Sequence, residues 1–183
     1  MIKKCVWANF SELLRKYHDE QWGRPLHDDQ KLFEMLILES KSCGLSWEII
    51  LKKSEYMRKV FDNFDPEKLV KYDNAKIEEL MQDAGIIRHR AKIEAVIENA
   101  KAYLKIKERE SFNNFLWRYV NYQPIVNDTS EIITKSKISD ELSKDLKKSG
   151  FKFVGSTIIY SFMQAVGMVD DHDIDCFCKT KTF

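Results

Sequence analysis

Residues 76–98, KIEELMQDAGIIRHRAKIEAVIE, form the stretch of sequence that decides the fold. Two segments with the apolar spacing of amphipathic helices flank a short turn at residues 84–87, and three basic residues follow it: Arg88, Arg90 and Lys92. Because Gly85 tolerates a positive φ, the chain can reverse sharply at the turn. The second helix then starts with backbone N–H groups that have no partner within the helix.

Such a helix start is a favourable place for an anion, and neighbouring Arg and Lys side chains strengthen it for phosphate. We therefore interpret residues 75–98 as a helix-hairpin-helix that holds a nucleic-acid backbone without reading its sequence. The alternative is an ordinary pair of helices in which the second has a basic, solvated start.

The length allows one or two folded domains, the composition favours helices, and we expect a single domain spanning residues 1–183. Hydrophobic residues make up 44% of the chain, while 6 Gly and 3 Pro argue against disorder. A net charge of +1 excludes a global basic field, so any DNA contact must come from local patches such as 88–92 and 147–152. The sequence shows neither a signal peptide nor an apolar run long enough to span a membrane. We expect a cytoplasmic monomer without an obligate protein partner, in which the four Cys are thiols or metal ligands.

Capping residues and apolar spacing predict an all-α helical bundle. The expected helices are 30–42 after Asp28 or Asp29, a helix from Ser46 to about 61, 66–71 after Asp65, 75–82, 88–107, 112–121 after Ser111, 140–149 after Ser139, and 155–166 before Gly167. Residues 122–138 are expected to form a long irregular connection, either a functional loop or a mobile one. The two chain ends, 1–27 and 168–183, are expected to be irregular.

These two ends contain four residues that suit a metal ion: Cys5, His18, His172 and Cys176. The spacing His172-x3-Cys176 places two ligands on one turn, and two thiolates with two imidazoles match tetrahedral zinc. One structural zinc ion would then clip the N-terminal tail to the C-terminal tail. Cys178 is an alternative to Cys176, and the alternative for the whole set is four unrelated residues in loose termini.

Glu39 is an acid on the apolar side of its expected helix. At 100° per residue it follows Leu32 and Leu36 along one face. A carboxylate in that position is costly unless it meets a donor or a cation, so Glu39 is a candidate site residue. The alternative is a Glu at a helix end that bends out to solvent.

Aromatic residues are dense in the first 47 positions: Trp7, Tyr17, Trp22 and Trp47. They can be core or surface anchors, or they can form a stacking pocket for a flat, electron-poor ring. Directly after the Glu39 helix, Gly44 and Leu45 form the tip of a tight link. That tip can act as a wedge in a base stack, or it can be a plain interhelical turn.

The chain resembles the constitutive bacterial 3-methyladenine DNA glycosylase I family in several long motifs. The matching runs are 17–23 (YHDEQWG), Leu38-Glu39, 44–47 (GLSW), 83–90 (DAGIIRHR), 150–155 (GFKFVG) and 160–165 (YSFMQA). The resemblance covers nearly the whole chain and implies the helix-hairpin-helix glycosylase fold. It also implies excision of N3-methyladenine from alkylated double-stranded DNA.

The resemblance further implies roles for particular residues. The zinc clip maps onto Cys5, His18, His172 and Cys176. The base pocket maps onto Trp7, Tyr17, Trp22, Glu39 and Trp47, with Glu39 and Tyr17 as catalytic residues, and the DNA-intruding loop maps onto Gly44 and Leu45. Together with Gly85, Arg88, Arg90 and Lys92 of the hairpin, this loop makes up the expected DNA-binding set.

Two features bear on the mechanism. Ser42 and Cys43 stand where the family often has Gln and Ala, so contacts to the DNA strand at the intruding loop can differ. Many hairpin glycosylases use an Asp shortly after the hairpin, whereas here no Asp occurs between Asp83 and Asp128. The expected mechanism therefore relies on the substrate, because N3-methylation makes adenine cationic and a good leaving group.

Two other classes of protein fit parts of the pattern. A non-enzymatic module could bind damaged or bent DNA through the same hairpin, with the aromatic residues in its core. A zinc-clipped bundle could serve protein interactions and would show no salt-dependent DNA binding. Release of a base from alkylated DNA distinguishes the glycosylase from both.

Overall fold

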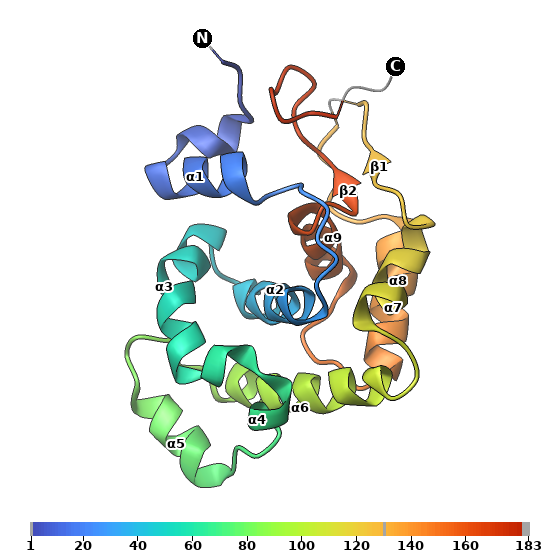
Figure 1. Cartoon of the computed structure of the whole chain (residues 1–183). Helices are drawn as coiled ribbons and strands as arrows, with labels where there is room; N and C mark the ends of the chain where they lie inside the picture. The colour runs from blue at the N-terminus through green and yellow to red at the C-terminus, as the bar shows by residue number, and fades with distance from the viewer. Residues whose placement is uncertain (1, 130, 181–183) are drawn as a thin grey trace.

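The computed structural model describes residues 2–129 and 131–180, and most of these residues are helical (Figure 1). The α-helices are α1 (Glu12–Glu20), α2 (Asp29–Ser42), α3 (Trp47–Val60), α4 (Pro66–Leu69), α5 (Asn74–Gln82), α6 (Arg90–Lys107), α7 (Phe112–Trp117), α8 (Lys137–Lys148) and α9 (Ser156–Ala165). Short 3-10 helices occupy Val6–Asn9, Asp62–Phe64 and Arg118–Val120. Two strands, β1 (Ile125–Val126) and β2 (Val169–Asp170), pair in parallel.

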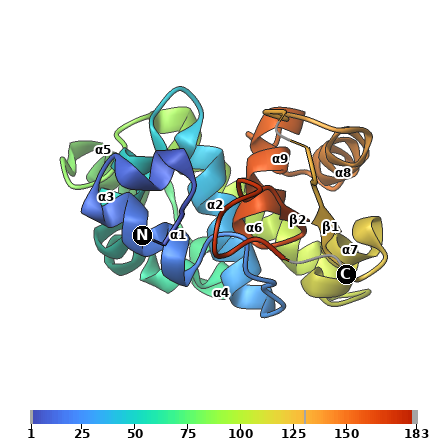
Figure 2. The ribbon, with the colours of Figure 1, turned by 90° about the horizontal axis from the view of Figure 1, so that it is seen from above.

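Helix α2 lies at the centre of the molecule and contacts α3, α6, α7 and α9. Seen from above, α1, α3 and α5 lie on one side, and α7, α8 and β1 on the other (Figure 2). The central position explains why almost every residue in the second half of α2 is buried, its polar residues included.

The core around α2 is rich in aromatic side chains. Trp117 is completely buried, and its indole N–H donates to the Leu26 carbonyl at 2.8 Å. The Phe112 ring stacks on Phe151, with centroids 5.9 Å apart, and meets Tyr103 edge-on. Packing of this kind fixes α2, which carries Glu39, and α6, which carries Arg90 and Lys92, in place.

Local capping chemistry explains where several helices start, as predicted. The side chains of Asp28, Ser46, Asp65 and Ser111 each accept a hydrogen bond from a backbone N–H in the first turn of the next helix. Pro66 occupies the first turn of α4, where a missing N–H does no harm.

The N-terminal end differs from the expectation, because residues 6–20 are largely helical instead of irregular. Ser11 caps α1 by accepting from the Leu14 N–H at 3.2 Å, and α1 buries Leu14, Tyr17 and His18. The predicted cap Ser139 was also wrong, since Ser136 caps α8 and Ser139 completes a capping box three residues later.

Several helix ends were also misplaced. Helix α4 ends at Leu69 instead of 71, α6 begins at Arg90 instead of 88, and α7 passes into a 3-10 turn after Trp117. Apart from β1, the described part of 122–138 that precedes α8 is irregular, as expected.

The two ends of the described chain meet. The Phe177 N–H donates to the Lys3 carbonyl at 3.0 Å, and the Val6 N–H donates to the Asp173 carboxylate at 3.0 Å. Strand β2 pairs with β1, which ties the irregular connection to the same region. None of the helices in the described residues is both long enough and apolar enough to cross a bilayer.

Candidate active site and DNA-binding surface

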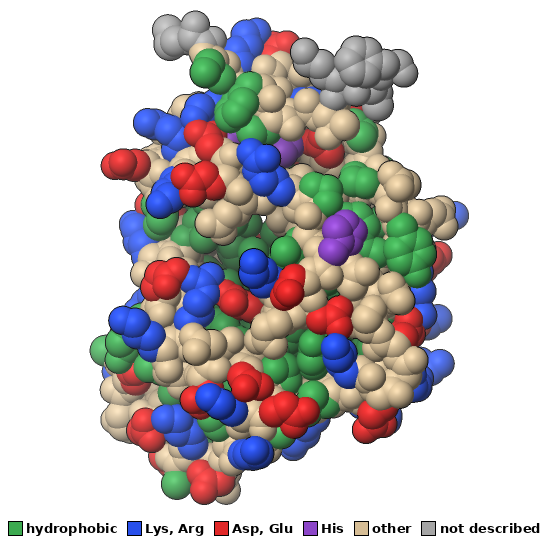
Figure 3. Space-filling model, in the orientation of Figure 1, with side chains coloured by type: hydrophobic (Ala, Val, Ile, Leu, Met, Phe, Trp, Pro, Cys, Tyr) green, Lys and Arg blue, Asp and Glu red, His purple; other side chains and the backbone are tan. Residues whose placement is uncertain are grey.

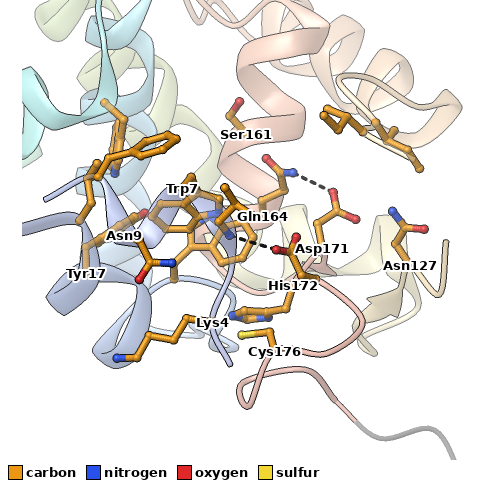
Figure 4. A pocket seen from close by; sticks show the side chains of 18 of the residues that line it. Lys4, Trp7, Asn9, Tyr17, Asn127, Ser161, Gln164, Asp171, His172 and Cys176 are labelled. Carbon is orange, nitrogen blue, oxygen red and sulfur yellow. Dashed lines mark hydrogen bonds between the residues drawn. The ribbon is translucent and has the colours of Figure 1, made fainter. Parts of the chain in front are cut away.

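A cleft of about 1660 Å³ opens between the N-terminal segment, the end of α2 and helix α9. The space-filling view shows a hollow lined by hydrophobic side chains, on a face where acidic and basic side chains are interspersed (Figure 3). Trp7 and Tyr17 come from the N-terminal segment, while Ser161, Gln164 and Asp171 come from α9 and the residue after β2 (Figure 4).

The predicted aromatic set comes together in this cleft, because Trp7, Tyr17, Trp22 and Trp47 all line it. Trp7 and Trp22 meet edge-on with centroids 5.0 Å apart, and Tyr17 lies 5.6 Å from Trp47. Tyr17 is buried, whereas the three Trp rings are partly open to the cleft. The arrangement provides flat, electron-rich walls of the kind that hold a planar cation.

Glu39 is buried at the floor of the cleft, so the alternative in which it bends out to solvent is wrong. Burial raises the pKa of its carboxyl to about 8, and the neighbouring Ser42 hydroxyl lowers it in part. Two polar atoms beside it, the Tyr17 hydroxyl and the Trp47 indole N–H, are buried and have no hydrogen-bond partner among the described residues. Buried polar groups are normally paired, so these atoms and the carboxyl are suited to a polar ligand.

The four predicted metal ligands also come together, at the junction of the two chain ends. Cys5, His18 and Cys176 place their ligand atoms within 4.8 Å of one another, and the His172 ring lies 5.3 Å from the His18 ring. All four side chains are buried.

Hydrogen bonds to carboxylates occupy Nδ1 of both imidazole rings and leave each Nε2 available to a ligand. His18 uses Nδ1 to meet Asp19 at 2.8 Å, and His172 uses Nδ1 to meet Asp170 at 2.7 Å. The Nε2 atom of His172 is buried without a hydrogen-bond partner in residues 2–129 and 131–180, and Nε2 of His18 faces the Cys176 sulfur at 3.3 Å. Carboxylate-bound imidazoles with a free Nε2 are typical of zinc sites, so these residues fit the ion.

Two further features bear on the ligand set. Burial raises the pKa of the Cys5 thiol to about 12, and the nearby Cys176 adds to this, so the thiol would lose its proton only beside a positive partner such as a metal ion. Cys178, the predicted rival of Cys176, groups with His18 and His172 within 4.8 Å. Cys178 therefore stays an alternative ligand.

The expected hairpin has two helices, α5 and α6, joined by residues 83–89. The predicted reason for Gly85 was wrong, since its φ is not positive. A Cβ at this position would lie 2.1 Å from the Tyr56 ring, so Gly85 is there to admit that ring. The Lys53 ammonium holds the turn by donating to the carbonyls of Ala84 and Gly85. His89, which carried no predicted role, is the N-cap of α6.

The three bases of the hairpin differ in their surroundings. Arg88 is exposed and makes no ion pair with any described residue. Arg90 is exposed but pairs with Glu78 at 2.6 Å and lies 3.8 Å from Glu94. Lys92 is buried, and its ammonium donates to the carbonyls of Lys41 and Cys43, so its expected phosphate contact does not fit its position.

The α2–α3 loop presents Leu45 beside the cleft. Gly44 has a φ of +77°, which favours glycine, and no atom of the described part of the chain lies within 4 Å of the place a Cβ would take. Leu45 is 37% exposed and lines the cleft together with Ser42 and Ser46. The side chain is therefore available to a partner, instead of belonging to the core.

The further cleft residues without a predicted role include Ser161, Gln164 and Asp171. The Asp171 carboxylate accepts hydrogen bonds from Tyr160 and Gln164, both at 2.7 Å. Its position directly before His172 is the one signal in the sequence that could have drawn attention to it.

Comparison with known proteins agrees with this geometry. The model of the methyladenine glycosylase family matches residues 7–179. DNA-3-methyladenine glycosylase of Haemophilus influenzae is 48% identical, over 98% of this chain and all of that protein. DNA-3-methyladenine glycosylase 1 of Escherichia coli is 51% identical, over 97% of each chain.

A solved structure extends the comparison to three dimensions. The 3-methyladenine DNA glycosylase I of Staphylococcus aureus, whose structure addresses recognition of 3-methyladenine, superposes with a TM-score of 0.93 at 41% identity. The match covers 98% of both chains. The chain therefore belongs to the methyladenine glycosylase family.

Proposed function

We propose that this DNA glycosylase releases N3-methyladenine from alkylated double-stranded DNA by hydrolysis of the N-glycosidic bond, which leaves an abasic site. The observation that carries the proposal is the buried Glu39 carboxyl beside the unpartnered Tyr17 hydroxyl and Trp47 indole N–H, inside a cleft lined by Trp rings. The names of the two bacterial relatives and of the Staphylococcus aureus structure support the same substrate.

The chemistry of the substrate fits a pocket with few catalytic groups. N3-methylation gives the base a positive charge, so it leaves as a neutral molecule and its glycosidic bond is weak. The enzyme must flip the nucleotide out of the duplex and hold it, which requires unstacking energy of a few kcal/mol. Normal adenine is neutral, so it gains little from electron-rich rings and keeps its strong bond.

Glu39 and the aromatic residues recognise different parts of the base. The Glu39 carboxylate accepts hydrogen bonds from the exocyclic amine edge of the base and favours its charge. Tyr17 and the Trp rings cover its faces. A cationic base beside Glu39 also lowers the pKa of the carboxyl from about 8, so binding of the substrate favours the charged form of the acid.

Two surfaces hold the DNA in this proposal. Helices α5 and α6 with the turn between them form a helix-hairpin-helix motif, and the start of α6 binds the DNA backbone together with Arg88. Arg90 also binds a phosphate, for which it gives up its ion pairs with Glu78 and Glu94. Leu45 at the tip of the α2–α3 loop fills the space left by the flipped nucleotide.

A structural zinc ion completes the proposal. Cys5, His18, His172 and Cys176 would hold it and join the N-terminal and C-terminal segments. Binding of the ion would stabilise the folded state of the segments that carry Trp7 and Tyr17, and so hold these two side chains in the pocket.

One assay tests the proposed reaction. Duplex DNA methylated with a small alkylating agent is incubated with the protein, and the released bases are identified by mass spectrometry. We expect 3-methyladenine to be released and unmodified adenine to stay in the DNA. Tight, salt-dependent DNA binding without base release would instead identify a non-enzymatic binding module.

A further inference from the structure

Two buried lysines cross at the junction of α2 and α6. The Lys92 ammonium donates to the Lys41 carbonyl at 2.9 Å and to the Cys43 carbonyl at 2.5 Å. In return, the Lys41 ammonium donates to the Lys92 carbonyl at 3.3 Å and lies over the Phe61 ring. Relative exposure is 1% for Lys41 and 7% for Lys92.

The contact has a clear physical role at the end of α2. The last carbonyls of a helix have no partner within the helix, and a cation there complements the helix dipole. Lys92 supplies such a cation from another helix. Burying an ammonium is unfavourable unless it is well bonded, and burial lowers the pKa of Lys92.

The position of this contact links two functional segments. Cys43 directly precedes Gly44 and Leu45, and Lys92 lies four residues after Arg88 on the helix that leaves the hairpin. A single buried side chain thus bonds the start of the Leu45 loop to the hairpin helix.

We propose that Lys92 is a positioning residue for base extrusion, which sets Leu45 at a fixed place relative to the hairpin that holds the DNA backbone. This inference rests on the proposed function. If the hairpin fixes the backbone and Leu45 fills the stack, both must act on the same nucleotide. A displacement of about 1 Å in such an arrangement can lower a rate about a hundredfold.

The test begins with Lys92→Met, which keeps the apolar stem and removes the donor. Lys101→Met, on the same helix but exposed and paired with Glu98, is the matched control for loss of one charge. We expect Lys92→Met to lower the single-turnover release of 3-methyladenine roughly tenfold or more. Its affinity for duplex DNA should change by less than about twofold, because the phosphate contacts remain.

Two measurements separate positioning from a loss of structure. Binding of free 3-methyladenine, followed by Trp fluorescence, should be unchanged in Lys92→Met, since the pocket does not include Lys92. If Lys92→Met does not fold, Lys92→Gln keeps a neutral donor, and the same measurements apply to it. A loss of free-base binding equal to the loss of release would overturn the proposal.

A double-mutant cycle with Leu45→Ala gives the sharpest result. If Lys92 acts through Leu45, the double variant releases base no more slowly than the slower single variant. Losses that multiply would show that Lys92 acts independently of Leu45, and would overturn the inference. A wild-type protein that releases no base would instead overturn the proposed function, so the two failures are distinguishable.

Discussion

Replacing Glu39 with Gln tests the pocket in two independent ways, because the substitution keeps the shape of the side chain and removes its charge. In the folded protein the pKa of Glu39 is raised from 4.5 to about 8 by burial. An unfolded chain releases the proton near pH 4.5, whereas the folded chain keeps it until about pH 8. The wild-type protein therefore loses stability as the pH rises between these two values.

The size of this effect follows from the pKa. Each pH unit within the window corresponds to about 1.4 kcal/mol, so the loss is at most on the order of 5 kcal/mol by pH 8. Glu39→Gln has no such proton to lose. We expect wild type and variant to be similar in stability near pH 4.5, and the variant to become progressively more stable than wild type up to about pH 8.

The same substitution should lower activity. A hydrogen bond to a charged group contributes about 1.5–3 kcal/mol, which corresponds to roughly tenfold to 150-fold in release of 3-methyladenine. In the wild type, kcat/KM should rise with pH toward about 8 as the free enzyme's carboxyl ionises, and Glu39→Gln should not show this rise. Glu39→Ala should be slower still, while nonspecific duplex binding stays nearly intact.

Chemical denaturation between pH 4.5 and 8.5, together with release assays at the same pH values, measures both effects. Glu141→Gln, an exposed acid on α8, is the matched control and should follow the wild type in both. Parallel stability curves for wild type and Glu39→Gln would refute the burial argument. Wild-type release rates in both Glu39 variants would make this acid a bystander.

The remaining predictions concern the metal, the hairpin and the loop. Metal analysis should find about one zinc per chain, and Cys176→Ser should lower both occupancy and stability; full occupancy in that variant would contradict the ligand set. Arg88→Ala should weaken binding to all duplex sequences and reduce the salt slope by about 1, whereas Arg109→Ala, in the turn after the far end of α6, should not. Equal slopes would remove Arg88 from the interface. Leu45→Ala should reduce base release while changing the free energy of unfolding by about 0.5 kcal/mol or less; a loss of about 2–5 kcal/mol would show that Leu45 belongs to the core.

Much of the fold could be predicted because the decisive signals are local. Asp28, Ser46 and Ser111 cap their helices through side-chain bonds that span three residues, so the sequence alone reveals them. Glu39 was also identifiable, since helical spacing places it on the apolar side of α2 whatever the tertiary structure.

Other features depend on packing that a linear sequence does not show. Helix α1 was missed because its buried stripe is short and includes His18, which counts as polar by composition. Lys92 resembles its basic neighbours in sequence, but the end of α2 lies against it and buries it. The Tyr56 ring against Gly85 is likewise a long-range contact, so only the structure shows why a side chain is excluded there.

The sequence indicated which residues form the site, but it did not show how their side chains are arranged. The resemblance to a known family supplied the grouping of Trp7, Tyr17, Trp22 and Trp47, which spacing alone left open. The structure adds that the Tyr17 hydroxyl and the Trp47 indole N–H are buried and find no hydrogen-bond partner within the described chain. Such atoms mark where a ligand binds, and no sequence pattern identifies them.

Titration of the wild-type protein with 3,9-dimethyladenine tests the central claim most directly, because the N9 substituent keeps the positive charge that the alkylated base has in DNA. The Trp47 indole N–H resonance and the Trp fluorescence report on the walls of the cleft, and neutral 9-methyladenine is the matched ligand. We predict saturable changes with 3,9-dimethyladenine that are much weaker with 9-methyladenine and are reduced in Glu39→Gln. Equal responses to the two bases, or none to either, would contradict the assignment of this cleft as the pocket for the alkylated base.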